Sequence, residues 1–193
     1  MNIAPNGQDL PVVRYQRNLV KFFAASFVIL AFLSLPKTTR ADFTASVSGN
    51  TVTFTGNGAS DTLTLGQQGA LLTQSCYSKG NKGFASAVDM DSSQAGEQTL
   101  SLAQVQKIVI NGGEGDDTLI IDNPAGSVFA PNTLILFNGE GGNDTLLIRG
   151  GGGASFAETY QPGPGKDEGM ITMSNGIVSQ VIQFITTDFI LVL

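Results

Sequence analysis

Three stretches of the chain share one pattern of apolar and polar positions around an Asp-Thr-Leu triplet. They are TVTFTGNGASDTLTL (51–65), IVINGGEGDDTLII (108–121) and LILFNGEGGNDTLLI (134–148). In each stretch, apolar residues stand seven and nine positions before the Asp and two and four positions after it. This period of two, with many β-branched residues, is typical of strands that bury one face. Each stretch therefore predicts a strand, a glycine-rich corner and a second strand.

The spacing of the three units predicts how they assemble. Asp117 and Asp144 are 27 residues apart, whereas Asp61 and Asp117 are 56 apart, about twice as far. A period near 27 is typical of one coil of a short parallel β-solenoid, in which equivalent side chains stack as ladders in the core. One expected ladder is Leu63, Leu119 and Leu146. The alternative all-β fold is an antiparallel β-sandwich, in which each glycine stretch is a hairpin loop.

The doubled interval implies a missing copy halfway along it, near Asp89. Its surroundings, ASAVDMDSSQAG, lack the preceding glycines and place Asp91 where a leucine is expected. This segment is either a degenerate copy of the repeat or a loop that makes an excursion from it.

Further signals extend the predicted repeat domain over residues 42–193. The stretch 101–110 suggests a bend that leads into the second unit, and YQPGPGKDEG (160–169) suggests a surface loop. Asn175-Gly176 is a strong hairpin or corner signal. The sequence stops in the apolar FILVL (189–193), and an exposed apolar edge strand invites association. Either this end pairs with something or the domain is a piece of a longer array.

The first 41 residues differ from the rest and predict export. Arg14, Arg17 and Lys21 precede an uncharged run from Phe22 to Pro36, which is shorter than the about 20 residues of a membrane span. Small residues at 39 and 41 favour signal-peptide cleavage after Ala41. The alternative is a retained N-terminal membrane anchor. In both cases we expect the remainder to be secreted or displayed at the cell surface.

Composition narrows the function of the exported part. Of the 193 residues, 41% are hydrophobic, and removal of the leader leaves five basic and fifteen acidic residues, a net charge of −10. Such a charge disfavours nucleic acid and anionic membranes as partners and favours cations. The sequence has no histidine, and its one cysteine, Cys76, excludes an intramolecular disulfide.

The glycine-rich corners resemble a known calcium-binding motif. GGEGDDTLI (112–120) matches G-G-x-G-x-D-x-U-x at every specified position, whereas GEGGNDTLL (139–147) has Glu140 in place of the second glycine. GNGASDTLT (56–64) keeps only part of the motif. The corners thus resemble the haemolysin-type (RTX) repeat and, more broadly, the Gly-, Asp-, Thr- and Leu-rich arrays of large bacterial surface proteins. The resemblance covers these loops alone, and RTX nonapeptides follow one another without the gaps of 18 residues or more seen here.

Both the resemblance and the preference of Ca²⁺ for carboxylate and carbonyl oxygens suggest that stacked corners share a calcium ion. Its candidate ligands are Asp117, Asp144, Gly113, Gly115, Asp116, Gly139, Gly141, Gly142, Asn143 and, more remotely, Asp61. Alternatively, each Asp caps its own corner by accepting backbone N–H groups, while glycine supplies positive φ. The two roles can coexist.

We expect no catalytic site. Asp116 and Asp117 are adjacent on a strand and would point to opposite faces, which does not suit a facing pair of carboxylates. The expected function is an exported calcium-binding structural or adhesive module, with calcium and other surface proteins or extracellular polysaccharide as partners. The alternatives are a calcium-independent structural solenoid and a polysaccharide lyase with a β-helix fold.

Overall fold

The computed structural model describes residues 43–76, 83–151 and 156–193 as an assembly of strands. The predicted leader, residues 1–41, lies outside these residues. The described part contains one short 3-10 helix, η1 (Leu102–Gln104), and no α-helix, so the expected all-β fold is confirmed. Accordingly, none of its helices is long and apolar enough to cross a membrane.

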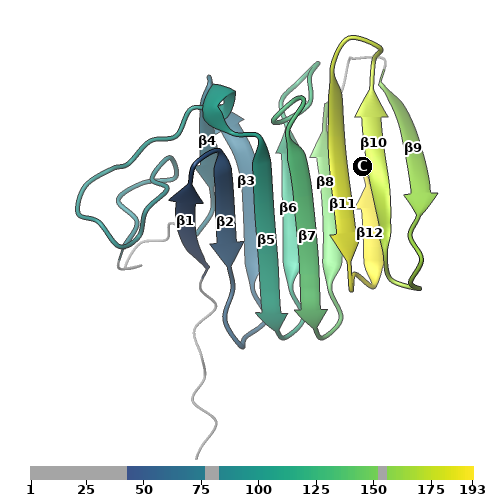
Figure 1. Ribbon diagram of the computed structural model, residues 1–193, viewed down its shortest axis with the longest axis horizontal. Coiled ribbons are helices and arrows are strands. Elements are labelled where there is room, and N and C mark those ends of the chain that lie inside the picture. Colours follow the sequence, from purple (N-terminus) through teal and green to yellow (C-terminus); the bar gives the residue numbers. More distant parts are fainter. Residues whose placement is uncertain (1–42, 77–82, 152–155) are drawn as a thin grey trace, which may run out of the picture. The chain divides into compact units, whose positions relative to one another are not determined.

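Twelve strands are found in the described ranges (Figure 1). They are β1 (Thr44–Ser48), β2 (Thr51–Thr55), β3 (Thr62–Gln68), β4 (Leu71–Gln74), β5 (Lys107–Glu114), β6 (Thr118–Asn123), β7 (Leu134–Gly141), β8 (Thr145–Gly150), β9 (Ala157–Pro162), β10 (Gly169–Ser174), β11 (Ser179–Ile185) and β12 (Phe189–Val192).

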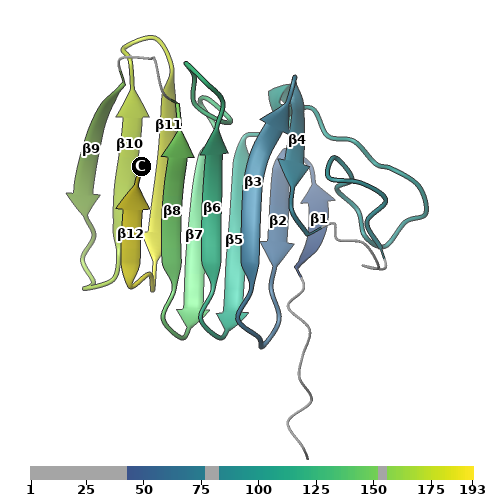
Figure 2. The same ribbon diagram turned by 180° about the vertical axis from the view of Figure 1, so that it is seen from behind.

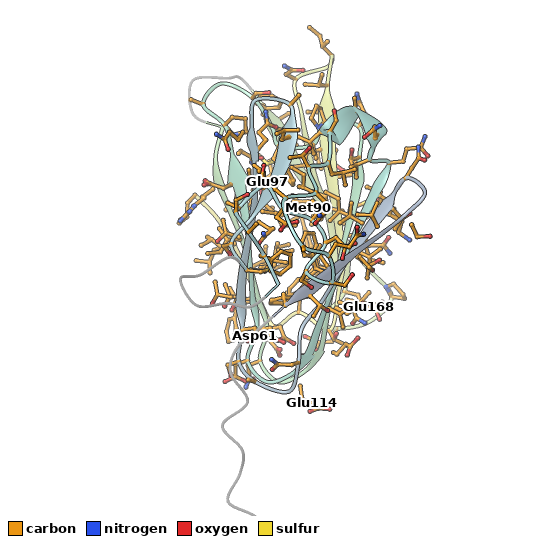
Figure 3. All side chains as sticks on the ribbon, turned by 90° about the vertical axis from the view of Figure 1, so that its left-hand side faces the viewer. Asp61, Met90, Glu97, Glu114 and Glu168 are labelled. Atoms are coloured by element: carbon orange, nitrogen blue, oxygen red, sulfur yellow. The ribbon has the colours of Figure 1, made fainter. Side chains whose placement is uncertain are left out.

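The strands form two mixed sheets that face each other across the apolar core (Figures 2 and 3). The larger sheet has the order β1-β2-β5-β7-β11-β10-β9, and the smaller one has the order β12-β8-β6-β3-β4. Every second residue of the central strands points inward and is fully or almost fully buried. The alternation seen in the sequence thus marks the face of each strand that packs against the other sheet.

The repeat segments adopt the predicted strand, corner and strand. In each, the first strand lies in the larger sheet and the second in the smaller sheet: β2 and β3 (unit 1), β5 and β6 (unit 2), β7 and β8 (unit 3). Leu63 pairs with Leu119, and Leu119 with Leu146, in parallel register, and all three are fully buried. The ladder is therefore confirmed. The alternative with hairpins at the glycine corners is wrong, because the strands flanking each corner belong to different sheets.

A fourth unit, which the sequence comparison missed, follows the same plan. Its strands, β11 and β12, pair in parallel with β7 and β8 of unit 3. Ile182 and Phe184 continue the inward rows of the larger sheet, and Ile190 continues the leucine ladder of the smaller one. The unit escaped notice because its corner is three residues shorter than that of unit 3 and has no glycine.

The segment around Asp89 is an excursion and not a copy of the repeat. After β4, which is antiparallel to β3, the chain leaves the sheets and returns through η1 to β5. Figures 1 and 2 show this excursion at the end of the sheets that carries β1 and β4. Phe84 and Met90 from it join the core, so it covers that end of the apolar interior.

The opposite end is built by two hairpins. Asn175-Gly176 forms the predicted turn between β10 and β11, with Gly176 at φ 84°. The prediction of a surface loop over 160–169 is wrong at its start, because Tyr160 and its neighbours belong to β9, which pairs with β10. Residues 163–168 do connect the two strands as a loop. β9 lacks the alternating burial of the other strands, which is why its pattern gave no strand signal.

Candidate functional site: the aspartate corners

The repeated Asp of each unit lies at the corner where the chain passes from the larger to the smaller sheet. Asp61 is 2% exposed, whereas Asp117 and Asp144 are completely buried. Figure 3 shows Asp61 at the end of the molecule where the corners lie. A buried carboxylate needs hydrogen-bond donors, since it has lost its water. The backbone N–H groups of neighbouring corners supply them.

From unit 2 onward, the carboxylate of each Asp accepts a hydrogen bond from the backbone N–H of the Asp in the preceding unit. The N–H of Asp61 donates to Asp117 Oδ1 at 2.8 Å, and the N–H of Asp117 donates to Asp144 Oδ1 at 2.8 Å. The N–H of Asp144 donates to Asp188 Oδ2 of unit 4 at 3.0 Å. We call these four residues the aspartate ladder. The ladder joins all four units through bonds between residues at least 27 positions apart.

A second row of bonds runs the opposite way on the outer side of the corners. The N–H of Asp116 donates to Ser60 Oγ at 3.0 Å, and the N–H of Asn143 donates to Asp116 Oδ1 at 2.9 Å. Here a side chain of one unit accepts from the backbone of the following unit. Consecutive corners are thus joined in both directions along the stack, by an inner and an outer set of side chains.

Glycine is required at the corners because the backbones approach one another closely. A Cβ on Gly112 would lie 2.5 Å from Asp117 Oδ2 and 2.6 Å from the carbonyl oxygen of Gly139. A Cβ on Gly139 would overlap Asp144 Oδ2 and the carbonyl oxygen of Thr186. Gly112 and Gly139 therefore make room both for the next unit and for the carboxylate of their own unit, whereas Gly56 makes room for the backbone of Gly112.

Backbone conformation adds a requirement at two other corner positions. Gly113, Gly115 and Gly142 adopt positive φ, as the motif predicts. Glu140 occupies the position equivalent to Gly113 and has φ 69°, a conformation that is unfavourable for a residue with a side chain. Its N–H donates to Thr186 Oγ1 at 2.8 Å, which helps to hold this strained residue in place.

Burial and the charges of neighbouring carboxylates raise the pKa of two carboxyls of the ladder, Asp117 and Asp144. Burial is the largest cause for Asp117, whose pKa rises to about 6, and the charges of Asp144, Asp61 and Asp116 act in the same direction. The hydrogen bond from the Asp61 N–H opposes the rise. Burial also raises the pKa of Asp144, with the charges of Asp188 and Asp116 adding to it. The ladder therefore favours neutralisation of its charge by a proton or a cation.

The arrangement brings together only part of a calcium shell. Asp117 Oδ2 and Asp144 Oδ2 are buried and accept no hydrogen bond from described residues. Their other oxygens already accept N–H groups, and the carbonyl oxygen of Gly141 accepts the N–H of Gly115. Within the described ranges, no three acidic or cysteine side chains converge where an ion could be held. The six to eight oxygens that Ca²⁺ favours are thus not assembled here by side chains.

The predicted ligands separate into three groups. Asp61, Asp117 and Asp144 lie inside the corners, while Asp116 and Asn143 bond to each other on the exposed outer side. The glycines, Gly113, Gly115, Gly139, Gly141 and Gly142, lie between the units, where they allow close stacking. The sequence comparison missed Asp188 and Ser60. Asp188 could have been recognised in the sequence by the apolar residues that stand two and four positions after it.

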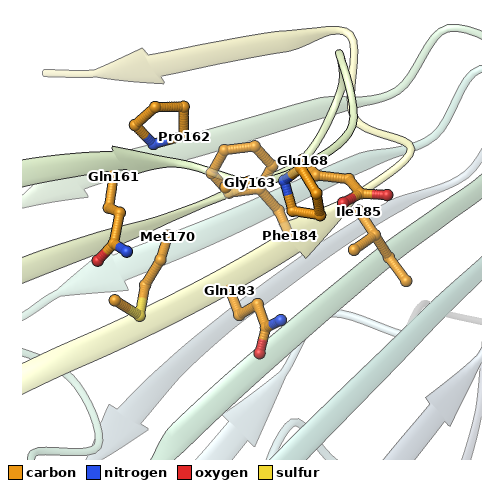
Figure 4. Close-up of a pocket in the computed structure, with 10 residues that line it drawn as sticks. Gln161, Pro162, Gly163, Glu168, Met170, Gln183, Phe184 and Ile185 are labelled. Atoms are coloured by element: carbon orange, nitrogen blue, oxygen red, sulfur yellow. The ribbon is translucent and has the colours of Figure 1, made fainter.

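A separate hollow of about 230 Å³ lies beside the loop that joins β9 to β10 (Figure 4). It is lined by residues such as Gln161, Pro162, Met170 and Phe184, and its ionisable lining residue is Glu168. The carboxylate of Glu168 accepts the N–H of Gly165 in its own loop at 3.2 Å. With one acid and no basic partner, this lining does not form a pair for acid and base catalysis.

Comparison with known proteins gave no match: no family model, no curated protein and no solved structure is similar to this chain.

Proposed function

We propose that this chain is an exported structural or adhesive module, built as a short parallel β-solenoid of four coils. The coils correspond to units 1 to 4. Two runs of parallel pairing support the proposal: β2-β5-β7-β11 in one sheet and β3-β6-β8-β12 in the other. Equivalent residues pair along both runs, as expected when one coil stacks on the next.

The aspartate ladder is the observation that carries the proposal. It connects every coil to its neighbour at the same point of the repeat, and its members are buried in the first three coils. A carboxylate that is buried inside a protein and accepts a backbone N–H group of a neighbouring coil contributes to the architecture and is not presented to a substrate. Arg149, which follows the third corner, is already engaged by Asp122 at 3.1 Å. These contacts favour a structural role over a catalytic one.

The structural role is tested by comparing Asp117→Ala with Asp116→Ala. The first variant leaves the buried N–H of Asp61 without its acceptor, at a cost of about 1–3 kcal/mol in the free energy of unfolding. The second removes an exposed acceptor and is expected to cost less than about 1 kcal/mol. Urea unfolding of both variants at pH 4.5 measures the difference, because Asp117 is then protonated in the folded protein and the first variant removes no buried charge. Equal losses of stability would contradict a structural role for the ladder.

Export of the module is tested separately by mass spectrometry of the chain recovered outside the expressing cell. Cleavage after Ala41 gives the mass of residues 42–193. Recovery of the uncleaved chain from the membrane fraction would instead support the anchor. The exported part has a net negative charge, which favours a surface protein or polysaccharide partner that is neutral or positively charged.

Calcium binding at the second and third corners is the second candidate function. It is favoured by the two buried oxygens, Asp117 Oδ2 and Asp144 Oδ2, and by the raised pKa of both carboxyls. If the corners bind the ion, millimolar Ca²⁺ raises the melting temperature relative to a chelator, because ligand binding stabilises the folded state. The double variant Asp117→Asn with Asp144→Asn abolishes that rise. An unchanged melting temperature in the unsubstituted protein would leave the calcium-independent module as the function.

A further inference from the structure

Beyond unit 4, the larger sheet extends further than the smaller sheet. The larger sheet continues past β11 with β10 and β9, whereas the smaller sheet stops at β12, the second strand of the same unit. In Figures 1 and 2, β12 overlaps β10, and β9 extends beyond the last strand of the smaller sheet. Within the described residues, the inward face of β10 is covered, because its Ile171 is 2% exposed, whereas β9 is exposed along its whole length.

A groove of about 230 Å³ lies at this step. Ile190 and Val192 of β12 line one side, and Ile171 of β10 and Tyr160 of β9 line the other. Tyr160 is 56% exposed although its ring stacks on that of the buried Phe184, with the centroids 6.2 Å apart. Glu158 supplies the groove's one charged side chain. The lining is thus apolar with an acidic end.

The free edge of β12 offers hydrogen-bonding groups to this groove. The N–H of Phe189 donates to Asp144 O at 3.0 Å and the N–H of Leu193 donates to Ile148 O at 2.9 Å, so both point toward β8. Because N–H and C=O groups alternate sides along a strand, those of Ile190 and Val192 point away from β8. β12 pairs with no other described strand.

A second copy of the chain does not fit this step. A copy rotated about an axis perpendicular to the smaller sheet, with its β12 beside this one, would bring its β10 into the space of β9, because β12 lies over β10. The opposite end of another copy cannot add to β12 either. The edge of its β4 is already occupied, since the N–H groups of Leu72 and Gln74 donate to Leu100 O and Ala87 O of the excursion.

We propose that the groove receives an extended strand from a partner protein, which adds to the free edge of β12. Apolar side chains at alternate positions of that strand pack against Tyr160, Ile190 and Val192, and a basic side chain lies at Glu158. Strand addition of this kind combines main-chain bonds with pockets for alternate side chains. This deepens the proposed adhesive function by naming its class of partner, and it does not depend on the aspartate ladder.

The test uses fluorescein-labelled nonapeptides of alternating valine and threonine, flanked at both ends either by lysine or by glutamate. Fluorescence anisotropy with the 193-residue chain measures their affinities. We expect the lysine-flanked peptide to bind more tightly. Glu158→Lys should weaken it by roughly tenfold and strengthen the glutamate-flanked peptide, because an ion pair becomes a repulsion. Glu97→Lys changes the net charge equally but lies on the excursion, and should leave the preference unchanged.

A backbone variant provides an independent measurement. Val192→Pro removes an N–H that faces the groove and none that bonds to β8, and proline is tolerated on edge strands. We expect an unchanged melting temperature with loss of binding of at least about tenfold, the equivalent of one hydrogen bond. Peptide binding that is indifferent to both substitutions would overturn the proposal. So would absence of binding, or a dimer whose formation competes with the peptide. Loss of the adhesive or structural role with retained, Glu158-dependent binding would count against the proposed function alone.

Discussion

The second and third corners each place a buried carboxylate against a glycine of the same unit. In units 2 and 3, the carboxylate of Asp117 lies over Gly112 and that of Asp144 over Gly139. The same glycines also contact the backbone of the next unit. Two requirements, space for a side chain and space for a neighbouring unit, therefore act on a single residue. This explains the glycine five positions before the Asp in units 2 and 3, while Gly56 of unit 1 meets only the second requirement.

Gly139→Ala is expected to destabilise the protein by about 2–3 kcal/mol, because the added methyl overlaps Asp144 Oδ2 and the carbonyl oxygen of Thr186. This corresponds to a fall in melting temperature of roughly 5–10 °C. Gly58→Ala is the matched control, since a Cβ there would contact nothing within 4 Å. Thermal unfolding followed by circular dichroism measures both variants. Similar melting temperatures for the two variants would contradict this prediction, because they would show that the corner can shift to accept a Cβ at residue 139 with little loss of stability.

The raised pKa of Asp117 predicts that stability increases in mild acid. The pKa of this carboxyl is about 6 in the folded protein and 3.8 in its ordinary state, so the folded protein binds the proton more tightly. The resulting stabilisation is complete below about pH 4 and is lost as the pH rises through about 6; it amounts to at most about 3 kcal/mol. Asp144 acts in the same direction.

The measurement is the free energy of unfolding from pH 4.5 to 7.5 for the unsubstituted chain and for Asp117→Asn. Asparagine keeps an oxygen acceptor for the Asp61 N–H but carries no charge, so this variant should be more stable at pH 7.5 and less dependent on pH. Asp116→Asn controls for the loss of a neighbouring charge. If the free energy of unfolding of the unsubstituted chain and of Asp117→Asn changed with pH in parallel, Asp117 would not be the source of the pH dependence.

At the scale of elements, the excursion between β4 and β5 shows how a segment without strands closes one end of the core. Asp89 is completely buried and accepts the N–H groups of Ala85, Asp91 and Gln98, at 2.8, 3.2 and 3.2 Å. Gln74 of β4 donates to the Asp89 carbonyl oxygen at 3.0 Å. The side chain of Asp89 thus organises the loop, and the side chain of Gln74 attaches the loop to the smaller sheet.

Asp89→Ala should open the excursion while the corners remain intact. Three partly buried N–H groups lose their acceptor, so cleavage at Glu97 by a glutamate-specific protease should become about tenfold faster or more. Asp91→Ala is the control, because that carboxylate bonds only to neighbours such as Ser93 within the loop. Resistance of the Asp89 variant equal to that of the control would show that core contacts of Phe84 and Met90 suffice to hold the excursion.

The four repeat units illustrate why some elements were predictable and others were not. Units 1 to 3 share apolar positions on both sides of the Asp, and such local periodicity survives in the sequence. Unit 4 keeps the positions after Asp188 but shortens its corner, which breaks the register of any alignment. The excursion was ambiguous for a different reason. Asp89 lies about one repeat period from Asp61 and from Asp117, but in the structure it belongs to a loop that buries it.

At the scale of the whole molecule, stability is expected to decline from the central units toward β9 and β12. Strands β5 to β8 have a parallel neighbour on either side, whereas β12 has one and β9 has only β10. In a stacked array each unit is stabilised by its neighbours, so the ends open first. The step at β12 therefore combines the least protected strands with the free edge proposed to accept a partner.

Amide hydrogen exchange tests this gradient. We expect the slowest exchange in β5, β6, β7 and β8, and exchange that is faster by about tenfold or more in β9 and β12. The excursion should give β3 and β4 more protection than β12, although all three lie near an end of the smaller sheet. Uniform protection across the units would indicate that the two sheets unfold as one cooperative body.

The sequence by itself determined the period, the inward rows and the positions of the glycine corners, because each depends on residues close together in the chain. It also identified Asp117 and Asp144 as neighbours. Only the tertiary structure decided that their carboxylates accept N–H groups across the corners, since those donors lie in other units. It likewise decided that the sheets end out of step at β12. This feature depends on the number of strands that join each sheet, and a local pattern of residues does not determine that number.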